Sequence, residues 1–132
     1  MITAVDSSVL LDVLKDDPNH RASSLAALSA ASETGPLIVC PVVWAEIRSF
    51  FEDAERMQHA FSDARIQFDP FDQECADVAG HHWFEYRRRG GTRKRLVADF
   101  LIGAHAQVRG GRFLTRDRGF FRRYFSDLQI LN

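Results

Sequence analysis

Four acidic residues occupy positions where a carboxylate needs a chemical explanation. Asp6 ends the short apolar run Ile2–Val5, and Asp117 stands just past another apolar run near the end of the chain. Glu46 and Asp99 lie inside the apolar segments VVWAEI and LVADFLI. A lone carboxylate in apolar surroundings costs several kcal/mol unless it is paired or bound to a metal. Either each acid pairs with an arginine, or the acids meet around a cation.

A cluster of four carboxylates would bind a hard divalent cation. One pair of like charges about 4 Å apart costs roughly 4 kcal/mol at an effective dielectric of 20, so the cluster would not stay ionised alone. Mg²⁺ or Mn²⁺ fits better than zinc because no His or Cys accompanies the acids. Such a metal suits phosphoryl transfer to water, since it lowers the pKa of bound water. The simpler alternative for Asp6 alone, that it only caps the helix that follows, stays open.

The elements that must position these acids alternate between strands and helices. Five apolar runs predict strands, at residues 2–5, 37–40, 66–68, 112–115 and 128–131. Helical spacing predicts two helices over residues 43–61, broken near Glu52 and Asp53, and a further helix over Leu96–Val108. Strands separated by helices imply crossovers and a parallel sheet covered on both faces. Ligands of such sheets bind beyond the carboxyl ends of the strands, where Asp6 and Asp117 would lie.

Length and composition fit one ordinary globular domain, residues 1–132. The formal net charge of −1 does not point to a polyanion partner, so any nucleic-acid surface would be a local patch. Cys40 and Cys75 form no CxxC pair and are expected to be buried free thiols, which suits the cytoplasm. No signal peptide or membrane span is expected from the apolar runs.

Four short motifs together carry a resemblance to a known family. They are Val5–Asp12 (VDSSVLLD), Trp44–Arg48 (WAEIR), Ala98–Ala106 (ADFLIGAHA) and Leu114–Phe120 (LTRDRGF). In this order and spacing the sequence resembles the PIN-domain ribonucleases, and within them the VapC-type toxins of prokaryotic toxin–antitoxin pairs. The resemblance implies a PIN-like three-layer α/β/α sandwich with a central five-stranded parallel sheet.

The resemblance also implies an activity and the residues that carry it. The activity would be a Mg²⁺-dependent endoribonuclease, with Asp6, Glu46, Asp99 and Asp117 as catalytic acids. Asp6, Asp99 and Asp117 would hold the metal, and no organic cofactor is expected. The hydroxyl groups of Ser7 and Thr115 would support those ligands from behind. The expected partners are an RNA substrate, a VapB-like antitoxin and a second copy of the chain in a homodimer, with no membrane.

Basic residues near the acids could hold RNA phosphates. Candidates are Arg93, Lys94 and Arg95, which follow a glycine pair, and Arg116 and Arg118, which flank Asp117. Arginine is also favoured at the solvated ends of helices, so the same pattern fits a surface without RNA.

Two other classes of function compete with the nuclease. A receiver-like phospho-acceptor domain also has a parallel sheet, and Asp69 ends the third predicted strand, where the acceptor would lie. However, such a domain leaves the helical acids Glu46 and Asp99 unexplained. A catalytically inactive PIN-fold module that binds RNA or protein is the other alternative, because fold alone does not prove activity.

Overall fold

The computed structural model describes residues 1–92 and 97–131. Within them the five strands are β1 (Thr3–Val5), β2 (Leu37–Val39), β3 (Ile66–Phe68), β4 (Arg112–Leu114) and β5 (Gln129–Leu131). They form one parallel sheet in the order β3-β2-β1-β4-β5. The predicted strands and the predicted five-stranded parallel sheet are thus confirmed, with strand ends up to one residue shorter than expected.

Burial explains which strand takes which place. Every residue of β1 and β2 is buried, as expected for strands covered on both faces by crossover helices. The outermost strands β3 and β5 expose Gln67, Phe68 and Gln129, because each pairs with only one neighbour. The central position of β1 places Asp6 in the middle of the carboxyl edge, between the ends of β2 and β4.

Seven helices in the described part of the chain surround the sheet. They are α1 (Ser7–Leu14), α2 (Arg21–Thr34), α3 (Pro41–Arg48), α4 (Ala54–Asp63), α5 (Gln73–Arg88), α6 (Val97–Arg109) and α7 (Arg118–Tyr124). The predicted break near Glu52 and Asp53 is confirmed, because Asp53 caps the start of α4 by accepting a hydrogen bond from the Arg56 amide. Of the predicted helix over 96–108, residues 97–108 are helical, and Leu96 lies outside the described residues.

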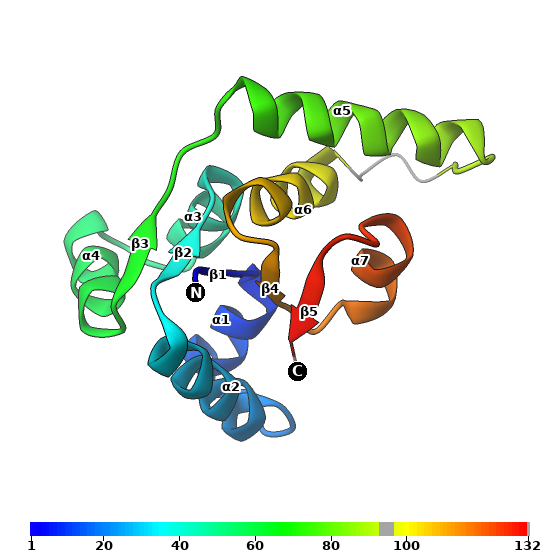
Figure 1. The fold of residues 1–132 in the computed structure, drawn as a ribbon. Helices are drawn as coiled ribbons and strands as arrows, with labels where there is room; N and C mark the ends of the chain where they lie inside the picture. Colours follow the sequence, from blue (N-terminus) through cyan, green and yellow to red (C-terminus); the bar gives the residue numbers. More distant parts are fainter. Residues whose placement is uncertain (93–96, 132) are drawn as a thin grey trace.

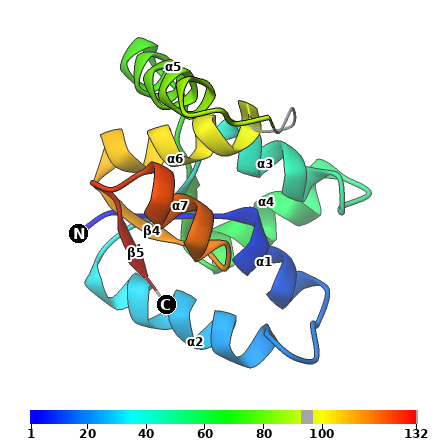
Figure 2. The ribbon, with the colours of Figure 1, turned by 90° about the vertical axis from the view of Figure 1, so that its right-hand side faces the viewer.

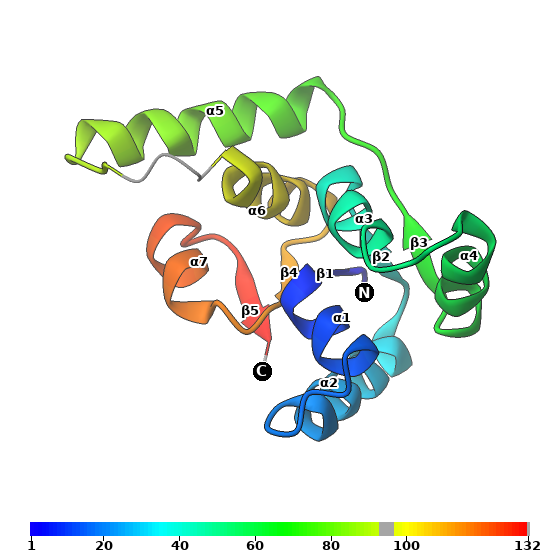
Figure 3. The same cartoon turned by 180° about the vertical axis from the view of Figure 1, so that it is seen from behind.

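The helices form layers on the two sides of the sheet. The helices α1 and α2 lie on one side and α5 and α6 on the other (Figures 1 and 3). Helix α5 packs along α6, which in turn contacts β1 and β4, so α5 forms the outer rim of that side. Seen from the β5 edge, α7 lies beside that strand (Figure 2). The arrangement confirms the predicted α/β/α sandwich.

Aromatic side chains dominate the core between α6, α7 and β4. Four phenylalanines are almost completely inaccessible to solvent: Phe100, Phe113, Phe121 and Phe125. The rings of Phe113 and Phe121 meet edge to face, with their centroids 4.7 Å apart. A Cβ atom on Gly103 of α6 would lie 2.6 Å from the Phe125 ring, so this glycine permits the close contact. This packing fixes α6, and with it Asp99, against the sheet.

No helix in the described residues is long and apolar enough to cross a membrane.

Candidate active site

Asp6 lies at the carboxyl end of β1, where the chain turns into α1. It is the N-cap residue of α1, and its Oδ1 accepts a hydrogen bond from the Ser7 amide at 2.8 Å. Its Oδ2 accepts hydrogen bonds from the Ser8 hydroxyl at 3.1 Å and the Thr115 hydroxyl at 2.7 Å. The residue is only 7% exposed. Asp6 is therefore both a helix cap and a buried carboxylate held by hydroxyl groups, so the capping alternative and the site prediction are compatible.

The surroundings of Asp6 oppose its ionisation. Burial raises the pKa of Asp6 above its usual value, and the nearby charge of Asp117 adds to that rise. The hydrogen bonds from Thr115, Ser8 and the Ser7 amide act in the opposite direction without cancelling it. A buried carboxylate whose charge is under-compensated in this way is a natural place for a cation.

Glu46 lies on α3, facing the start of α1. Its Oε1 accepts a hydrogen bond from the Ser7 hydroxyl at 3.3 Å. Desolvation raises the pKa of Glu46, and the charges of Asp6 and Asp99 raise it further. The apolar sequence around Glu46 predicted a buried carboxylate, but Glu46 is exposed because the buried face of α3 is formed by Val43 and Ile47 instead.

The other two predicted acids, Asp99 and Asp117, lie at the starts of α6 and α7. Asp99 is half-buried in the first turn of α6, and α6 packs against α3, which carries Glu46. Asp117 is exposed just before α7, and its amide donates a hydrogen bond to the Thr115 hydroxyl at 3.0 Å. Asp6 interacts with both Glu46 and Asp117, and Glu46 interacts with Asp99. The structure thus brings the four predicted acids into one electrostatic group.

The donor chemistry of this group fits a hard divalent cation, since all four side chains offer carboxylate oxygens. Their spacing is open: these acids are not among the described groups of three or more residues whose ligand atoms lie within 4.8 Å of one another. Within residues 1–92 and 97–131, the group that meets this spacing is Asp12, Asp17 and His20, which the sequence did not single out.

The oxygens of Asp12 already have partners in the protein. Arg116 donates from Nε to Oδ2 at 2.6 Å and from Nη2 to Oδ1 at 2.9 Å, and the Ser24 hydroxyl donates to Oδ2 at 2.6 Å. Asp12 is 2% exposed, so these bonds satisfy a buried charge. The criterion that selected Glu46 and Asp99, an acid within an apolar segment, also applies to Asp12 in LLDVL and would have found it.

The predicted RNA-binding arginines fall in different settings. Arg116 points its guanidinium at Asp12, as described above. Arg116 and Arg118 both line a cleft of about 240 Å³ that also includes Thr115, His20 and Ser23. Residues 93–95, the other predicted basic group, lie outside the described residues.

A second polar network lies near the carboxyl end of the edge strand β3. Asp69 Oδ2 lies 2.7 Å from His105 Nε2 and accepts a hydrogen bond from Arg109 Nε at 2.6 Å. Arg109 also donates to Asp72 Oδ2 and to the Pro70 carbonyl oxygen, both at 2.9 Å. His105 of α6 is thus part of this network.

Asp69 is therefore engaged in holding the loop after β3 to α6. A receiver-like acceptor would need its carboxylate to be accessible to a phosphoryl donor, and here a histidine and an arginine share one oxygen.

Solved structures with the same fold come from toxin–antitoxin complexes. VapBC2 from Rickettsia felis bound to a promoter DNA fragment contains a chain with a TM-score of 0.77 and 20% identity, covering 100% of this chain and 98% of that one. A chain of VapBC-1 from nontypeable Haemophilus influenzae has a TM-score of 0.75 and 16% identity, covering 100% of this chain and 98% of that one. A chain of DNA-bound VapBC from Salmonella typhimurium has a TM-score of 0.70 and 18% identity, covering 99% of this chain and 97% of that one. At these identities the likeness establishes the fold.

No protein of curated function matches the chain at significant similarity. The family model described as PIN domain matches residues 3–126, which include all four acids at the carboxyl edge of the sheet. The chain belongs to the PIN domain family.

Proposed function

We propose that this protein is a Mg²⁺-dependent endoribonuclease and the VapC-like toxin of a type II toxin–antitoxin pair. The observation that carries the proposal is the buried Asp6 carboxylate, whose pKa is raised and which is electrostatically coupled to Glu46 and Asp117 at the carboxyl edge of a PIN sheet. Structural likeness to chains of VapBC complexes supports the toxin assignment.

In this proposal each residue has a defined task. Asp6, Asp99 and Asp117 would hold the metal, and the exposed Glu46 would accept a proton from the attacking water. When bound, Mg²⁺ or Mn²⁺ supplies an activated water and neutralises charge on the phosphate. Thr115 keeps the Asp6 carboxylate in one orientation by donating to Oδ2 at 2.7 Å.

Ser7 links the two sides of the site. Its amide donates to Asp6 and its hydroxyl lies within hydrogen-bond distance of both Asp6 Oδ1, at 3.5 Å, and Glu46 Oε1, at 3.3 Å. It therefore fixes the separation of the metal-holding acid from the proton acceptor. We retain Arg118 and residues 93–95 as RNA contacts, whereas Arg116 is committed to Asp12.

The alternative of a catalytically inactive PIN module is decided by metal dependence. We expect the purified protein, freed of any inhibitor, to cleave RNA with Mg²⁺ or Mn²⁺ and to lose activity in EDTA, with recovery on adding excess Mg²⁺. Mapping of 5′ ends in total RNA measures the cleavage. Full activity in EDTA would exclude the metal mechanism, and absence of both cleavage and Mg²⁺-linked thermal stabilisation would favour the inactive module.

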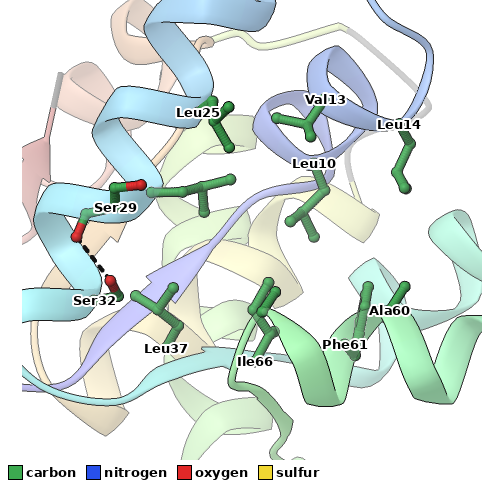
Figure 4. Close-up of a pocket in the computed structure, with 12 residues that line it drawn as sticks. Leu10, Val13, Leu14, Leu25, Ser29, Ser32, Leu37, Ala60, Phe61 and Ile66 are labelled. Carbon is green, nitrogen blue, oxygen red and sulfur yellow. Dashed lines mark hydrogen bonds between the residues drawn. The ribbon is translucent and has the colours of Figure 1, made fainter.

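An apolar groove lies away from the four acids. This groove of about 340 Å³ runs between α1, α2 and α4 and is lined by Leu10, Val13, Leu25 and Phe61 among others (Figure 4). Leu25 is 40% exposed at its rim, although apolar side chains of this size usually gain by burial. We assign this groove to an apolar segment of the VapB-like antitoxin.

A charge placed in this groove should weaken the complex and spare catalysis. We expect Leu25→Asp to reduce affinity for the product of the adjacent antitoxin gene by about tenfold or more, since a charged side chain would be buried in an apolar interface. Calorimetric titration measures the affinity, with exposed Ala26→Asp on the same helix as the matched control. Unchanged affinity of the Leu25 variant would place the antitoxin elsewhere.

A further inference from the structure

The loop that carries Thr115 and Asp117 is tied to α1 by an ion pair whose carboxylate is buried and whose arginine side chain is 37% exposed. Arg116 lies between those two residues and reaches Asp12 with two parallel hydrogen bonds, at 2.6 and 2.9 Å. Asp12 is 2% exposed, and Ser24 of α2 donates a third bond to it. Fork-to-fork pairing of this kind fixes the direction of the guanidinium as well as its distance.

The backbone of the same residue is tied to the site itself. The Arg116 amide donates to the Ser8 hydroxyl oxygen at 3.2 Å, and that hydroxyl donates to Asp6 Oδ2 at 3.1 Å. The residues on either side are linked through Thr115, whose hydroxyl accepts from the Asp117 amide and donates to Asp6. Movement of Arg116 would therefore shift two of the groups that surround the buried carboxylate.

We propose that Arg116 is a positioning residue, anchored by Asp12, that fixes Thr115 and Asp117 relative to Asp6. This inference rests on the proposed nuclease site for its functional meaning. It assigns Arg116 a task inside the protein in place of a phosphate contact.

The energetics oppose the replacement of Asp12 by an RNA phosphate. Asp12 uses Nε and one N–H of Nη2, so a phosphate could contact only the remaining N–H groups of Arg116 unless it drew the guanidinium away from Asp12. That exchange would leave a buried carboxylate with the Ser24 hydroxyl as its remaining side-chain hydrogen bond among those described, at a cost that a solvent-exposed phosphate contact does not recover. The pair is therefore expected to persist when RNA binds.

The test compares Arg116→Lys, Asp12→Asn and the double variant by steady-state RNA cleavage. Lysine keeps the charge but cannot form the two parallel bonds. We expect kcat to fall by about tenfold or more in each single variant, as for other residues that orient ligands, with KM and the salt dependence of KM unchanged. The kcat of the double variant should be no lower than that of the less active single variant. Arg56→Lys, which alters an exposed pair with Asp53, should change neither constant.

Amide hydrogen exchange provides a readout that does not need activity. We expect the amides of Arg116 and Asp117 to exchange about tenfold faster or more in both single variants than in the wild type, because their acceptors lose a fixed position. Circular dichroism identifies any variant that has failed to fold, and Asp12→Asn tests the same pair from the other side.

Each outcome distinguishes the roles. One outcome is a raised KM at unchanged kcat, with the slope of log KM against log salt concentration smaller by about one. This result would mean that Arg116 contacts a phosphate, and it would overturn the proposal. Unchanged exchange together with unchanged kinetics would also overturn it. If the wild type cuts no RNA, the proposed function fails, and the exchange data still decide whether the pair positions the loop.

Discussion

Asp6→Asn is expected to reduce RNA cleavage by about 10²–10³-fold, the usual cost of removing one preorganised electrostatic group from an active site. Asparagine fits the same space. Its carbonyl oxygen can still accept from the Ser7 amide, and its NH₂ group can donate to the Ser8 and Thr115 hydroxyls, which rotate to accept. The loss would therefore reflect charge rather than misfolding. Cleavage rates at saturating Mg²⁺ and RNA measure it.

The same variant should be more stable than the wild type in the absence of metal. Burial raises the native pKa of Asp6 above 3.8, so the native state binds a proton in a pH range where the unfolded state has lost it. Stability from this group is present below pH 3.8 and is lost as pH rises through the raised native pKa. At neutral pH the asparagine removes that penalty, and we expect a gain of about 0.5–2 kcal/mol in the free energy of unfolding.

Asp77→Asn provides the matched control, because Asp77 is exposed on α5 and takes no part in the site. It should leave both cleavage and stability unchanged. Urea denaturation in EDTA measures the free energies of unfolding. Wild-type cleavage by Asp6→Asn would show that this carboxylate is not a catalytic ligand, and a less stable apo variant would show that its charge is already compensated in the native state.

The sheet was predictable because its signals are local. Each buried strand is a short apolar run, as in Leu37–Val39, bounded by turn residues such as Gly35 and Pro36. Helix α7 was not predicted, although Asp117 precedes it as a possible cap. Gly119 in its first turn weakens the helical pattern, and its packing depends on Phe113 of β4, a contact that no local pattern contains.

Within the site, residue types were predictable and pairings were not. The position of Asp6 at a strand end follows from the sequence, and so does its proximity to Thr115 once β1 and β4 are neighbours. The bond between Arg116 and Asp12 joins residues 104 positions apart. Charge patterns on the chain give no information about such a partner, so the arginine was equally compatible with RNA.

A second large effect is expected at Arg109, where the loop after β3 is held to α6. Its guanidinium donates to Asp69, Asp72 and the Pro70 carbonyl oxygen. Glutamine at position 109 cannot make all three bonds. We expect Arg109→Gln to lower the free energy of unfolding at pH 7 by about 2 kcal/mol. This value is smaller than the summed contributions of three hydrogen bonds that involve charged groups, because solvent screens a partly exposed site.

The pH dependence of this effect has a defined sign. Hydrogen bonds from Arg109 and His105 hold the pKa of Asp69 below 3.8 against the opposing effect of desolvation, and the Cys75 amide and Arg109 lower that of Asp72 to about 2. The stabilisation is therefore present above about pH 4 and is lost as pH falls through the lowered native values. The difference between wild type and Arg109→Gln should shrink over that range.

His105 adds acid sensitivity at higher pH. Its ring is 1% exposed, and desolvation lowers its pKa below 6.5 even though Asp69 favours the charged form. As pH falls below 6.5, His105 takes up a proton in the unfolded state but resists it in the native state. Stability therefore declines before Asp69 and Asp72 become protonated. A His105→Gln variant should lose this first decline and keep the later one below about pH 4.

Urea denaturation at a series of pH values from 7 to 3 separates these contributions. Arg88→Gln is the control for Arg109→Gln, since Arg88 also lies 2.6 Å from a carboxylate, that of Glu85, but on the exposed face of α5. We expect Arg88→Gln to change stability little at any pH, because exposed pairs are screened by solvent. Equal losses for the two arginine variants would mean that the network at Asp69 contributes no more than a surface ion pair, and that packing alone holds the loop after β3 against α6.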